Sequence, residues 1–360
     1  MTRRGQVLMI TIRGDMLEGG GQILRLSTAL AALMGEPIKI VKVRGKRRPP
    51  GLRRQHMTAL EVLASLCNGR VEGLRLGSTE VFFEPGDIGG GSYRFDVGTA
   101  GSVSLILQAA MPVMVFAPSP VKLRLRGGTN NPMAPPVDYL ERILLEDLKL
   151  MGVEARLRVY RRGFYPRGGG EVEVQTQPSR RLKPLVLQDL GRILEVRGLV
   201  YSCRLPSHIA NRMASSASER LRRAGLDPVF EREVLQPGNP KCSLDPGCGI
   251  VLSVKHSYGF FGVDNLGVKG KRAELVGLEA ADQLIKLVEG GYPVDRHLCD
   301  QLIVWMALAD GVSRVKTIEL TLHALTCIEL TKTILKAEFK VEGDLGKPAV
   351  IECRGIGYER

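Results

Sequence analysis

Three glycine triplets most limit how this chain of 360 residues can fold. They stand at 19–21, 89–91 and 168–170, and their starts are 70 and 79 residues apart. That spacing exceeds the roughly 20 to 50 residues of a typical solenoid repeat. It therefore predicts a repeated supersecondary unit, in a chain whose length predicts two domains or one domain with an insertion.

Hydrophobic periodicity predicts the same order of elements after the first two triplets. The first unit is expected to contain a helix at 23–34, a strand at 38–43 and a helix through 57–66. The second is expected to contain a helix at 103–110, a strand at 121–126 and a helix at 139–150. Each unit is thus predicted to run strand, helix, strand, helix, strands.

The third unit is predicted to be interrupted. A strand at 172–176 is expected to open it, but the helices expected at 296–309 and 325–335 follow only about a hundred residues later. The intervening segment has strands and helices of its own, expected at 195–203, 208–224, 249–256 and 274–289. We therefore predict a small inserted α/β domain at 184–291, within a large domain made of 1–183 and 292–360.

The composition favours a soluble protein with an acidic partner. Lys and Arg number 51 against 38 Asp and Glu, which leaves a formal charge of +13. Hydrophobic residues make up 44% of the chain, which is ordinary for a protein with a packed core and argues against disorder. Aromatic residues make up only 5%, which disfavours a protein that stacks successive bases on aromatic platforms.

The cysteines, the start of the chain and its most apolar window indicate in which cellular compartment the protein is expected. The seven cysteines are odd in number and scattered, unlike a disulfide scaffold, so a reducing, cytoplasmic location is expected. Cys242 and Cys248 have no second pair of ligands nearby, which gives a zinc site weak support. The start of the chain lacks the pattern of a signal peptide. The most apolar window, 103–121, contains Gln108 and three prolines, which favours buried core over a membrane span.

Three loops could bind phosphate or another polar ligand. Glu18 and the first triplet open onto a helix containing Arg25, where free backbone N–H groups and a cation could meet an anion, although a plain turn explains them equally well. The segment 44–56 places six cations and a histidine in thirteen residues. Its prolines and glycine favour a shaped phosphate-binding loop over a solvated turn. The polar turn at 126–136 is either a ligand-facing loop or a long surface connection.

His323 is the most suggestive histidine. It lies where a strand-like run at 315–320 gives way to the helix expected at 325–335. A helix N-terminus there would stabilise a bound phosphate and keep the imidazole neutral, as a nitrogen nucleophile requires. Taken alone, a single histidine is more often a hydrogen-bonded core residue. His297, Asp300 and Gln301 share one helix face, which is either a pocket lining or a solvated surface.

Standard nucleotide-binding motifs are missing from the sequence. It contains neither G-x-x-x-x-G-K-[ST] nor G-x-G-x-x-G, so ATP, if it is used, is held in another way. The nearest match to the K-x-D-G signature of lysine-adenylate ligases begins at Lys340 and carries Glu342 in place of the aspartate, within a hairpin-like pattern. A lysine nucleophile is therefore not expected.

Seven ordered segments together resemble the RNA 3'-terminal phosphate cyclase family. They are LEGGGQILR, VRGKRRPPGLRRQH, GTAGSVSLILQ, RGGTNNPMAPP, GFYPRGGGEV, DRHLCDQLIVWMALADG and TLHALT, and they span nearly the whole chain. The resemblance implies an α/β (α+β) fold with three βαβαββ-type units in a large domain and a smaller inserted α/β domain.

The same resemblance implies an ATP-dependent enzyme that converts an RNA 3'-phosphate into a 2',3'-cyclic phosphate and releases AMP and pyrophosphate. His323 matches the family histidine that forms a covalent histidyl-AMP. The adenylyl group then passes to the RNA end, giving RNA(3')pp(5')A, before the 2'-OH closes the ring. A divalent cation, Mg²⁺ or Mn²⁺, helps pyrophosphate leave. The implied partners are ATP and an RNA 3'-phosphate end, with no membrane and no stable protein partner.

The resemblance also assigns individual residues. Those matching nucleotide-binding positions are Gln108, Pro135, Arg296, His297, Leu298, Cys299, Asp300 and Gln301. Those matching the basic cluster around the RNA terminal phosphate are Arg25, Arg44, Arg47, Arg54, Gln55 and His56. Glu18 matches a carboxylate near the metal and phosphates, and Asp300 a ribose or metal contact.

Two alternatives remain at this point. A cyclase-like factor of ribosome biogenesis shares the fold without catalysis, but it lacks the active-site histidine, so His323 argues against it. Enolpyruvyl transferases share repeated βαβαββ units and bind small anions, but their signature loops are not apparent here.

Overall fold

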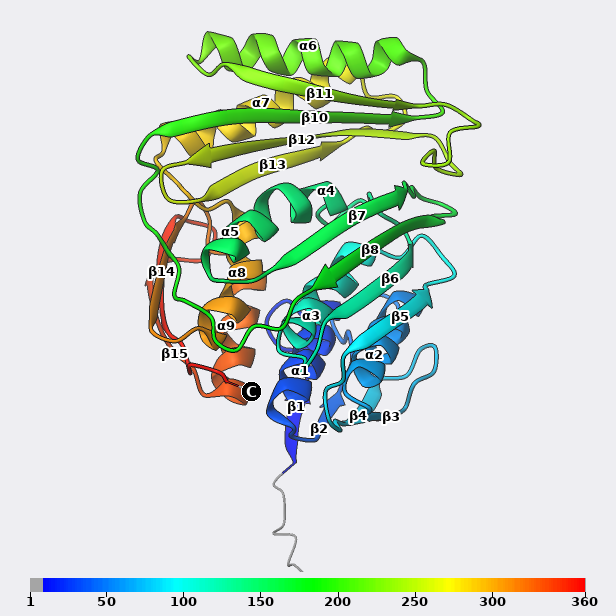
Figure 1. Cartoon of the computed structure of the whole chain (residues 1–360), viewed down its shortest axis with the longest axis vertical. Helices are drawn as coiled ribbons and strands as arrows, with labels where there is room; N and C mark the ends of the chain where they lie inside the picture. The colour runs from blue at the N-terminus through cyan, green and yellow to red at the C-terminus, as the bar shows by residue number, and fades with distance from the viewer. Residues whose placement is uncertain (1–8, 360) are drawn as a thin grey trace, which may run out of the picture.

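Four sheets of four strands make up the framework of the computed structural model, which describes residues 9–359 (Figure 1). The first sheet contains, in spatial order, β1 (Ile10–Arg13), β2 (Ile38–Val41), β4 (Glu80–Glu84) and β3 (Arg70–Glu72). Its helices are α1 (Gly21–Met34) and α2 (Arg54–Leu66).

The second and third sheets repeat this order of strands. The second contains β5 (Gly91–Asp96), β6 (Val121–Gly127), β8 (Gly170–Thr176) and β7 (Ala155–Arg161). Its helices are α3 (Val103–Val115) and a segment that runs from α4 (Val137–Tyr139) through a π-helical turn (Leu140–Leu144) into α5 (Leu145–Leu150). The third contains β9 (Val186–Leu187), β14 (Val312–Thr317), β16 (Ala349–Arg354) and β15 (Glu338–Gly343), with helices α8 (Arg296–Leu308) and α9 (Leu322–Leu335).

Strand directions are also shared by these three sheets. When the strands of each sheet are counted along the chain, the first runs parallel to the second. The fourth lies between the second and the third and is antiparallel to both. A parallel pair needs a crossover connection, which the helix between its strands provides. The α/β fold class expected from the sequence is therefore confirmed, while the domain boundaries stay a prediction.

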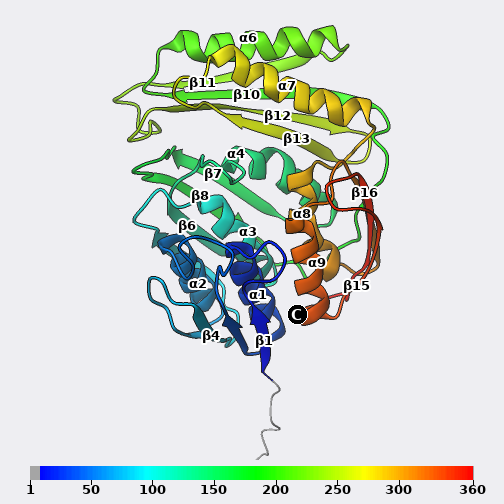
Figure 2. The ribbon, with the colours of Figure 1, turned by 180° about the vertical axis from the view of Figure 1, so that it is seen from behind.

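The fourth sheet lies between 184 and 291. It contains β11 (Pro228–Leu235), β10 (Ile193–Cys203), β12 (Gly247–His256) and β13 (Phe260–Leu266). Helices α6 (Ser207–Arg223) and α7 (Ala273–Glu289) cover its outer face, and its other face points toward the rest of the molecule (Figures 1 and 2). We refer to this layer as the insert.

Two expectations about strands are wrong. The strand expected to open the third unit, 172–176, is instead the last strand of the second sheet, where β8 pairs with both β6 and β7. The first strand of the third sheet is β9, whose two residues are too short to leave an alternating pattern. The strand expected at 315–320 spans 312–317, and α9 begins at Leu322, so His323 lies inside its first turn.

The core lies between the three sheets, with α1 at its centre. Every residue of α1 from Ile23 to Leu33 is buried, as expected for a helix that is surrounded on all sides. It packs against α2, α3 and α9, while α8 packs against α9. Helix α3 continues through Pro112, and all its apolar side chains except that of Leu105 are buried, which confirms the expectation of core for the helical part of this window. Among residues 9–359, no helix is long and apolar enough to cross a membrane.

Candidate functional site

A cavity of about 1600 Å³ opens between the insert and the N-terminal ends of several core helices. Four helices contribute their first or second residue to its wall, through Gly21 and Gln22 of α1, Gln55 of α2, Arg296 and His297 of α8, and His323 of α9. Helix N-termini carry partial positive charge and unpaired backbone N–H groups. Their convergence makes this cavity suited to polyanionic ligands.

His323 is held by a neighbouring helix. Its Nδ1 lies 2.7 Å from Oε1 of Gln22, while Nε2 of Gln22 donates to Sγ of Cys327 at 3.0 Å. Because the amide nitrogen of Gln22 faces the thiol, its oxygen faces the ring, and Nδ1 carries the imidazole proton. The lone pair of the neutral ring is then on Nε2, the nitrogen available for nucleophilic attack.

The environment of His323 favours that neutral form. Partial desolvation lowers the pKa of His323 below its ordinary value, and the cations Arg25 and Arg47 act in the same direction while Glu18 opposes them. Helix α9 begins after Thr321, whose hydroxyl accepts from the backbone N–H of Ala324 at 3.0 Å. His323 therefore combines a rigid support with an unprotonated nitrogen at neutral pH.

Glu18 lines the cavity, and only one of its two carboxylate oxygens is paired within the described residues. Its side chain is 3% exposed, and Oε2 accepts from Nη2 of Arg47 at 3.1 Å. Oε1 has no hydrogen-bond partner among the described residues. A buried carboxylate oxygen normally has a partner, so this atom is a candidate ligand for a cation. Within residues 9–359, no three His, Cys, Asp or Glu side chains form a ready-made metal cluster.

Burial shifts the pKa values of basic groups in and beside the basic loop. Burial lowers the pKa of Arg25 to about 10, and it lowers the pKa of His56 to about 3, an effect that nearby arginines increase. Nδ1 of His56 accepts from the backbone N–H of Arg53 at 3.2 Å and caps α2. Arg44 donates to the carbonyls of Pro49 and Gly51 at 3.1 and 2.9 Å, which gives the loop a fixed shape.

The polar turn at 126–136 forms another part of the wall. Asn130, Asn131 and the segment 132–135 line the cavity together with Gln108. The carbonyl of Pro135 accepts from the hydroxyl of Ser104 at 2.6 Å, which ties this loop to the start of α3. Oε1 of Gln55 accepts from the backbone N–H of Ser102 at 2.8 Å, so part of the role of Gln55 is structural.

Helix α8 presents one polar face to the cavity. Asp295 caps it by accepting from the backbone N–H groups of His297 and Leu298 at 2.9 and 3.1 Å. Asp300 and Gln301 lie one turn further on and also line the cavity. Burial raises the pKa of Asp300 well above its ordinary value.

Three of the predicted site residues lie outside the cavity wall. Leu298 and Cys299 are fully buried on the core face of α8, and Arg54 is exposed at the start of α2. The other predicted residues line the wall, as Glu18, Arg25, Arg44, Arg47, Gln55, His56, Gln108, Pro135, Arg296, His297, Asp300, Gln301 and His323.

The insert supplies cavity residues that the sequence analysis missed. They include Asp264 at the edge of its sheet, Lys269 in the following loop, and Gln283 and Lys286 of α7. Burial, with Asp295 nearby, raises the pKa of Asp264 to about 7. No motif marks these residues, and only the folding of the insert over the core helices brings them to the cavity.

Comparison with known proteins gives one family. A family model described as RNA 3'-terminal phosphate cyclase matches residues 16–341. Similar proteins of that name come from Ignicoccus hospitalis, 44% identical over 98% of this chain and 100% of the relative, and Hyperthermus butylicus, 44% identical over 98% and 99%. That of Methanopyrus kandleri is 42% identical over 97% and 99%. A solved structure, the enolpyruvyl transferase NikO from Streptomyces tendae, gives a TM-score of 0.27 at 11% identity over 97% of this chain and 82% of that one, too low to bear on the fold.

Proposed function

The chain belongs to the RNA 3'-terminal phosphate cyclase family, and from this we propose how its cavity performs the family reaction. The protein is an ATP-dependent enzyme that converts an RNA 3'-phosphate into a 2',3'-cyclic phosphate. The observation that carries the proposal is the position of His323, whose Nδ1 lies 2.7 Å from Oε1 of Gln22 where the N-termini of four helices line one cavity. The lowered pKa of His323 agrees with it.

In the first step, Nε2 of His323 attacks the α-phosphorus of ATP. A P–N bond forms, the bond between the α-phosphorus and the bridging oxygen breaks, and pyrophosphate leaves with the electron pair. The backbone N–H groups at the starts of α1 and α9 offset the charge that develops on the phosphate oxygens. The lowered pKa of His323 means that no proton has to be removed from Nε2 first.

In the second step, an oxygen of the RNA 3'-phosphate attacks the adenylylated phosphorus, and the imidazole leaves. The RNA then ends in a 3'–5' pyrophosphate linkage to adenosine. The vicinal 2'-OH attacks the RNA phosphorus, loses its proton, and expels AMP as the ring closes. Activation comes first because a phosphomonoester has no good leaving group, while the vicinal hydroxyl is already positioned.

The side chains of the wall divide between two ligands in this proposal. Those that would hold ATP are Gln108, Pro135, Arg296, His297, Asp300 and Gln301. Those that would hold the RNA terminal phosphate are Arg25, Arg44, Arg47, Gln55 and His56. Buried and partly buried arginines suit the second role because their planar donors match phosphate oxygens.

The free oxygen of Glu18 fits a divalent cation. Mg²⁺ is commonly bound by one or two carboxylates together with substrate phosphates, so a ready-made cluster of protein ligands is not needed. Glu18 and Asp300 would hold the ion in this proposal. When bound, it would neutralise charge on the departing pyrophosphate.

Three broader predictions accompany this function. We place the large domain at 1–183 and 292–360 and the inserted domain at 184–291, consistent with a separate sheet between these limits. A cytoplasmic location agrees with the absence of disulfides among the cysteines of residues 9–359. The alternative of a non-catalytic ribosome-biogenesis factor is disfavoured by the presence and support of His323.

Labelling with ATP tests the proposal. Incubation with α-³²P-ATP and Mg²⁺ or Mn²⁺ is expected to leave a label on the protein that is labile in acid and stable in alkali, as a phosphoramidate should be. The His323→Ala variant is expected to take up no label. His208→Ala, which removes an exposed histidine on α6, is the matched control and should label normally. A labelled His323→Ala protein would remove His323 from the mechanism.

A further inference from the structure

A buried arginine joins the insert to the rest of the molecule. The side chain of Arg162 is 3% exposed, and its Nη1 and Nη2 donate to the two oxygens of Asp138 at 2.8 and 2.9 Å. Its Nε donates to Glu233 on β11 of the insert. Its guanidinium also lies over the ring of Tyr201 on β10, 4.3 Å from the centroid. Arg162 therefore contacts two strands of the insert and one residue of the large domain at the same time.

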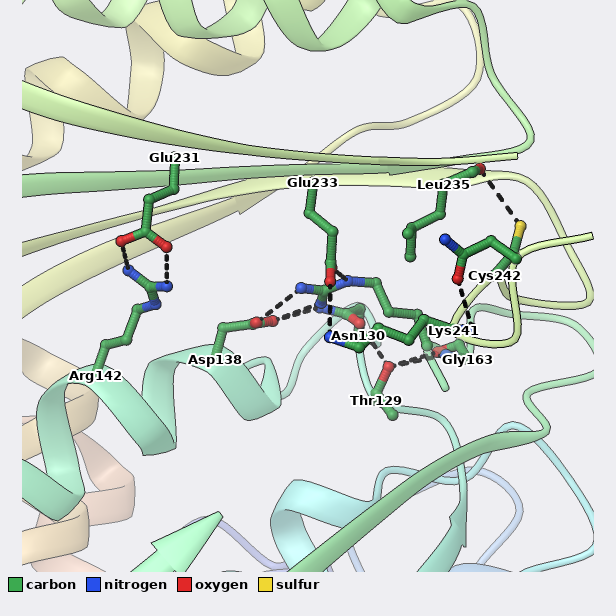
Figure 3. A network of polar contacts seen from close by, with 12 residues as sticks. Thr129, Asn130, Asp138, Arg142, Gly163, Glu231, Glu233, Leu235, Lys241 and Cys242 are labelled. Atoms are coloured by element: carbon green, nitrogen blue, oxygen red, sulfur yellow. Dashed lines mark hydrogen bonds and ion pairs between the residues drawn. The ribbon is translucent and has the colours of Figure 1, made fainter. Parts of the chain in front are cut away.

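The same network reaches the polar loop of the cavity wall (Figure 3). Asp138 also accepts from Nδ2 of Asn130 at 3.3 Å, and Oδ1 of Asn130 accepts from the hydroxyl of Thr129 at 2.6 Å. The residue after Arg162 adds two contacts, since Gly163 and Thr129 exchange a backbone N–H···O=C bond at 2.9 Å and an N–H···Oγ1 bond at 2.9 Å. An unbroken chain of hydrogen bonds thus runs from Glu233 to Asn130.

Burial makes this network hard to rearrange. Desolvation would raise the pKa of Asp138, but Arg162 outweighs it, so that the pKa lies below its ordinary value and the carboxylate stays charged. A buried charge that loses its partner is strongly destabilising, so Arg162 and Asp138 hold each other in one geometry. Nothing in the mechanism derived above uses Arg162, and none of its atoms lines the cavity.

We propose that Arg162 is a positioning residue that sets the place of the loop 129–135 and thereby couples the insert to nucleotide binding. The inference rests on the proposed function, in which Pro135 of this loop contacts ATP. A loop released from the network would sample more positions, and ATP binding would have to order it again. His323 and Gln22 belong to other elements, so the chemical step at saturating ATP is left intact.

The structure offers a matched control on the same strand. Glu231, two residues before Glu233 on β11, forms a bidentate pair with Arg142 at 3.1 and 2.7 Å. This pair also joins the insert to the large domain, but no hydrogen bond leads from it to the loop 129–135 among the described residues. Glu231→Ala and Glu233→Ala therefore remove similar bridges, and only the second touches the proposed network.

Steady-state turnover of these variants, followed as pyrophosphate release from γ-³²P-ATP in the presence of an RNA 3'-phosphate, tests the proposal. Glu233→Ala is expected to raise the KM for ATP about tenfold, the lower end of the range that corresponds to one hydrogen bond to a charged group, with kcat little changed. Arg162→Lys should behave alike, because an ammonium cannot span both carboxylates. Glu231→Ala should leave KM unchanged. An equal rise in both glutamate variants, or an unchanged KM in Glu233→Ala and Arg162→Lys, would overturn the assignment.

Hydrogen exchange separates this inference from the proposed function. In the absence of ATP, the amides of Thr129 and Asn130 are expected to exchange faster in Glu233→Ala than in wild type, and at the wild-type rate in Glu231→Ala. Unchanged exchange in Glu233→Ala would refute the network even if catalysis is normal. A wild-type protein that takes up no label would refute the proposed function while this comparison still reports on Arg162.

Discussion

Gln22→Ala removes the contact that orients His323, and the size of its effect follows from that contact. The bond between Gln22 and Nδ1 is 2.7 Å long and joins two neutral groups. A bond of this kind contributes about 0.5 to 1.5 kcal/mol net, which at 298 K is a factor of about 2 to 12 in rate. Without it, the ring can turn and the proton can move to Nε2, the nitrogen that must attack. We therefore expect adenylylation at saturating ATP to slow by about that factor, with little change in the melting temperature.

Gln22→Glu provides the matching test of orientation. Its carboxylate still accepts from Nδ1, so the rate at pH 8 is expected to stay close to that of wild type. The added negative charge raises the pKa of His323, so the Glu variant should lose activity at a higher pH than wild type as the solution is acidified. Single-turnover labelling between pH 5 and 8 measures both effects. A wild-type rate in Gln22→Ala, or equal loss in both variants at pH 8, would refute the role of Gln22.

Two further predictions concern RNA binding and stability. Lys269→Ala combined with Lys286→Ala is expected to weaken the salt dependence of RNA-end binding, with self-labelling intact. The slope of log K against log salt concentration should become shallower by about 0.7 for each phosphate that the protein no longer neutralises. The control, Lys122→Ala with Lys332→Ala, removes the same charge elsewhere and should leave this slope unchanged. Buried His56 has a pKa of about 3, below the roughly 6.5 of an unfolded chain, so its contribution to stability is complete above about pH 6.5 and falls as the pH drops. Between pH 7 and 5, urea unfolding of His56→Gln should lose about 2 kcal/mol less than wild type, and an equal loss would contradict this.

Long apolar helices were predictable from the sequence, and short or polar strands were not. Helix α1 is mostly apolar because it is buried between the sheets, which makes its pattern easy to recognise. Strand β11 exposes Val229 together with the adjacent polar residues Glu231 and Arg232, so its sequence does not alternate regularly between buried apolar and exposed polar residues. Strand β9 has only two residues and is defined by its pairing with β14, which no local pattern encodes.

The candidate site divides in the same way. The residue types and spacing of the basic loop already favour phosphate binding, and the family resemblance assigns roles to His323 and Glu18, which taken alone have equally simple structural explanations. Asp264 and Lys286 belong to the insert, and their proximity to the cavity depends on how two layers of the molecule pack. The partners that matter for Arg162 are likewise far away in sequence, since Glu233 lies 71 residues further along the chain. Contacts between residues so far apart in sequence can be recognised only from the tertiary structure.

The fold itself explains why the reactive side chains meet. In the first two of the three similar sheets, the chain leaves the first strand, enters a helix, and returns to a parallel strand; in the third sheet, the insert and then α8 lie between β9 and β14. That crossover places the start of the helix at the carboxyl end of the first strand, as in other α/β folds. Gln22 of α1 and His297 of α8 lie at the starts of such crossover helices, while Gln55 of α2 and His323 of α9 lie at the starts of helices that follow the second strand of their sheets. All four are the second residue of their helix and line one cavity. The helix N-termini supply a general affinity for anions. In the proposed function the side chain at the second position adds the chemistry, with the amide of Gln22 in α1 orienting the ring and His323 in α9 acting as the nucleophile.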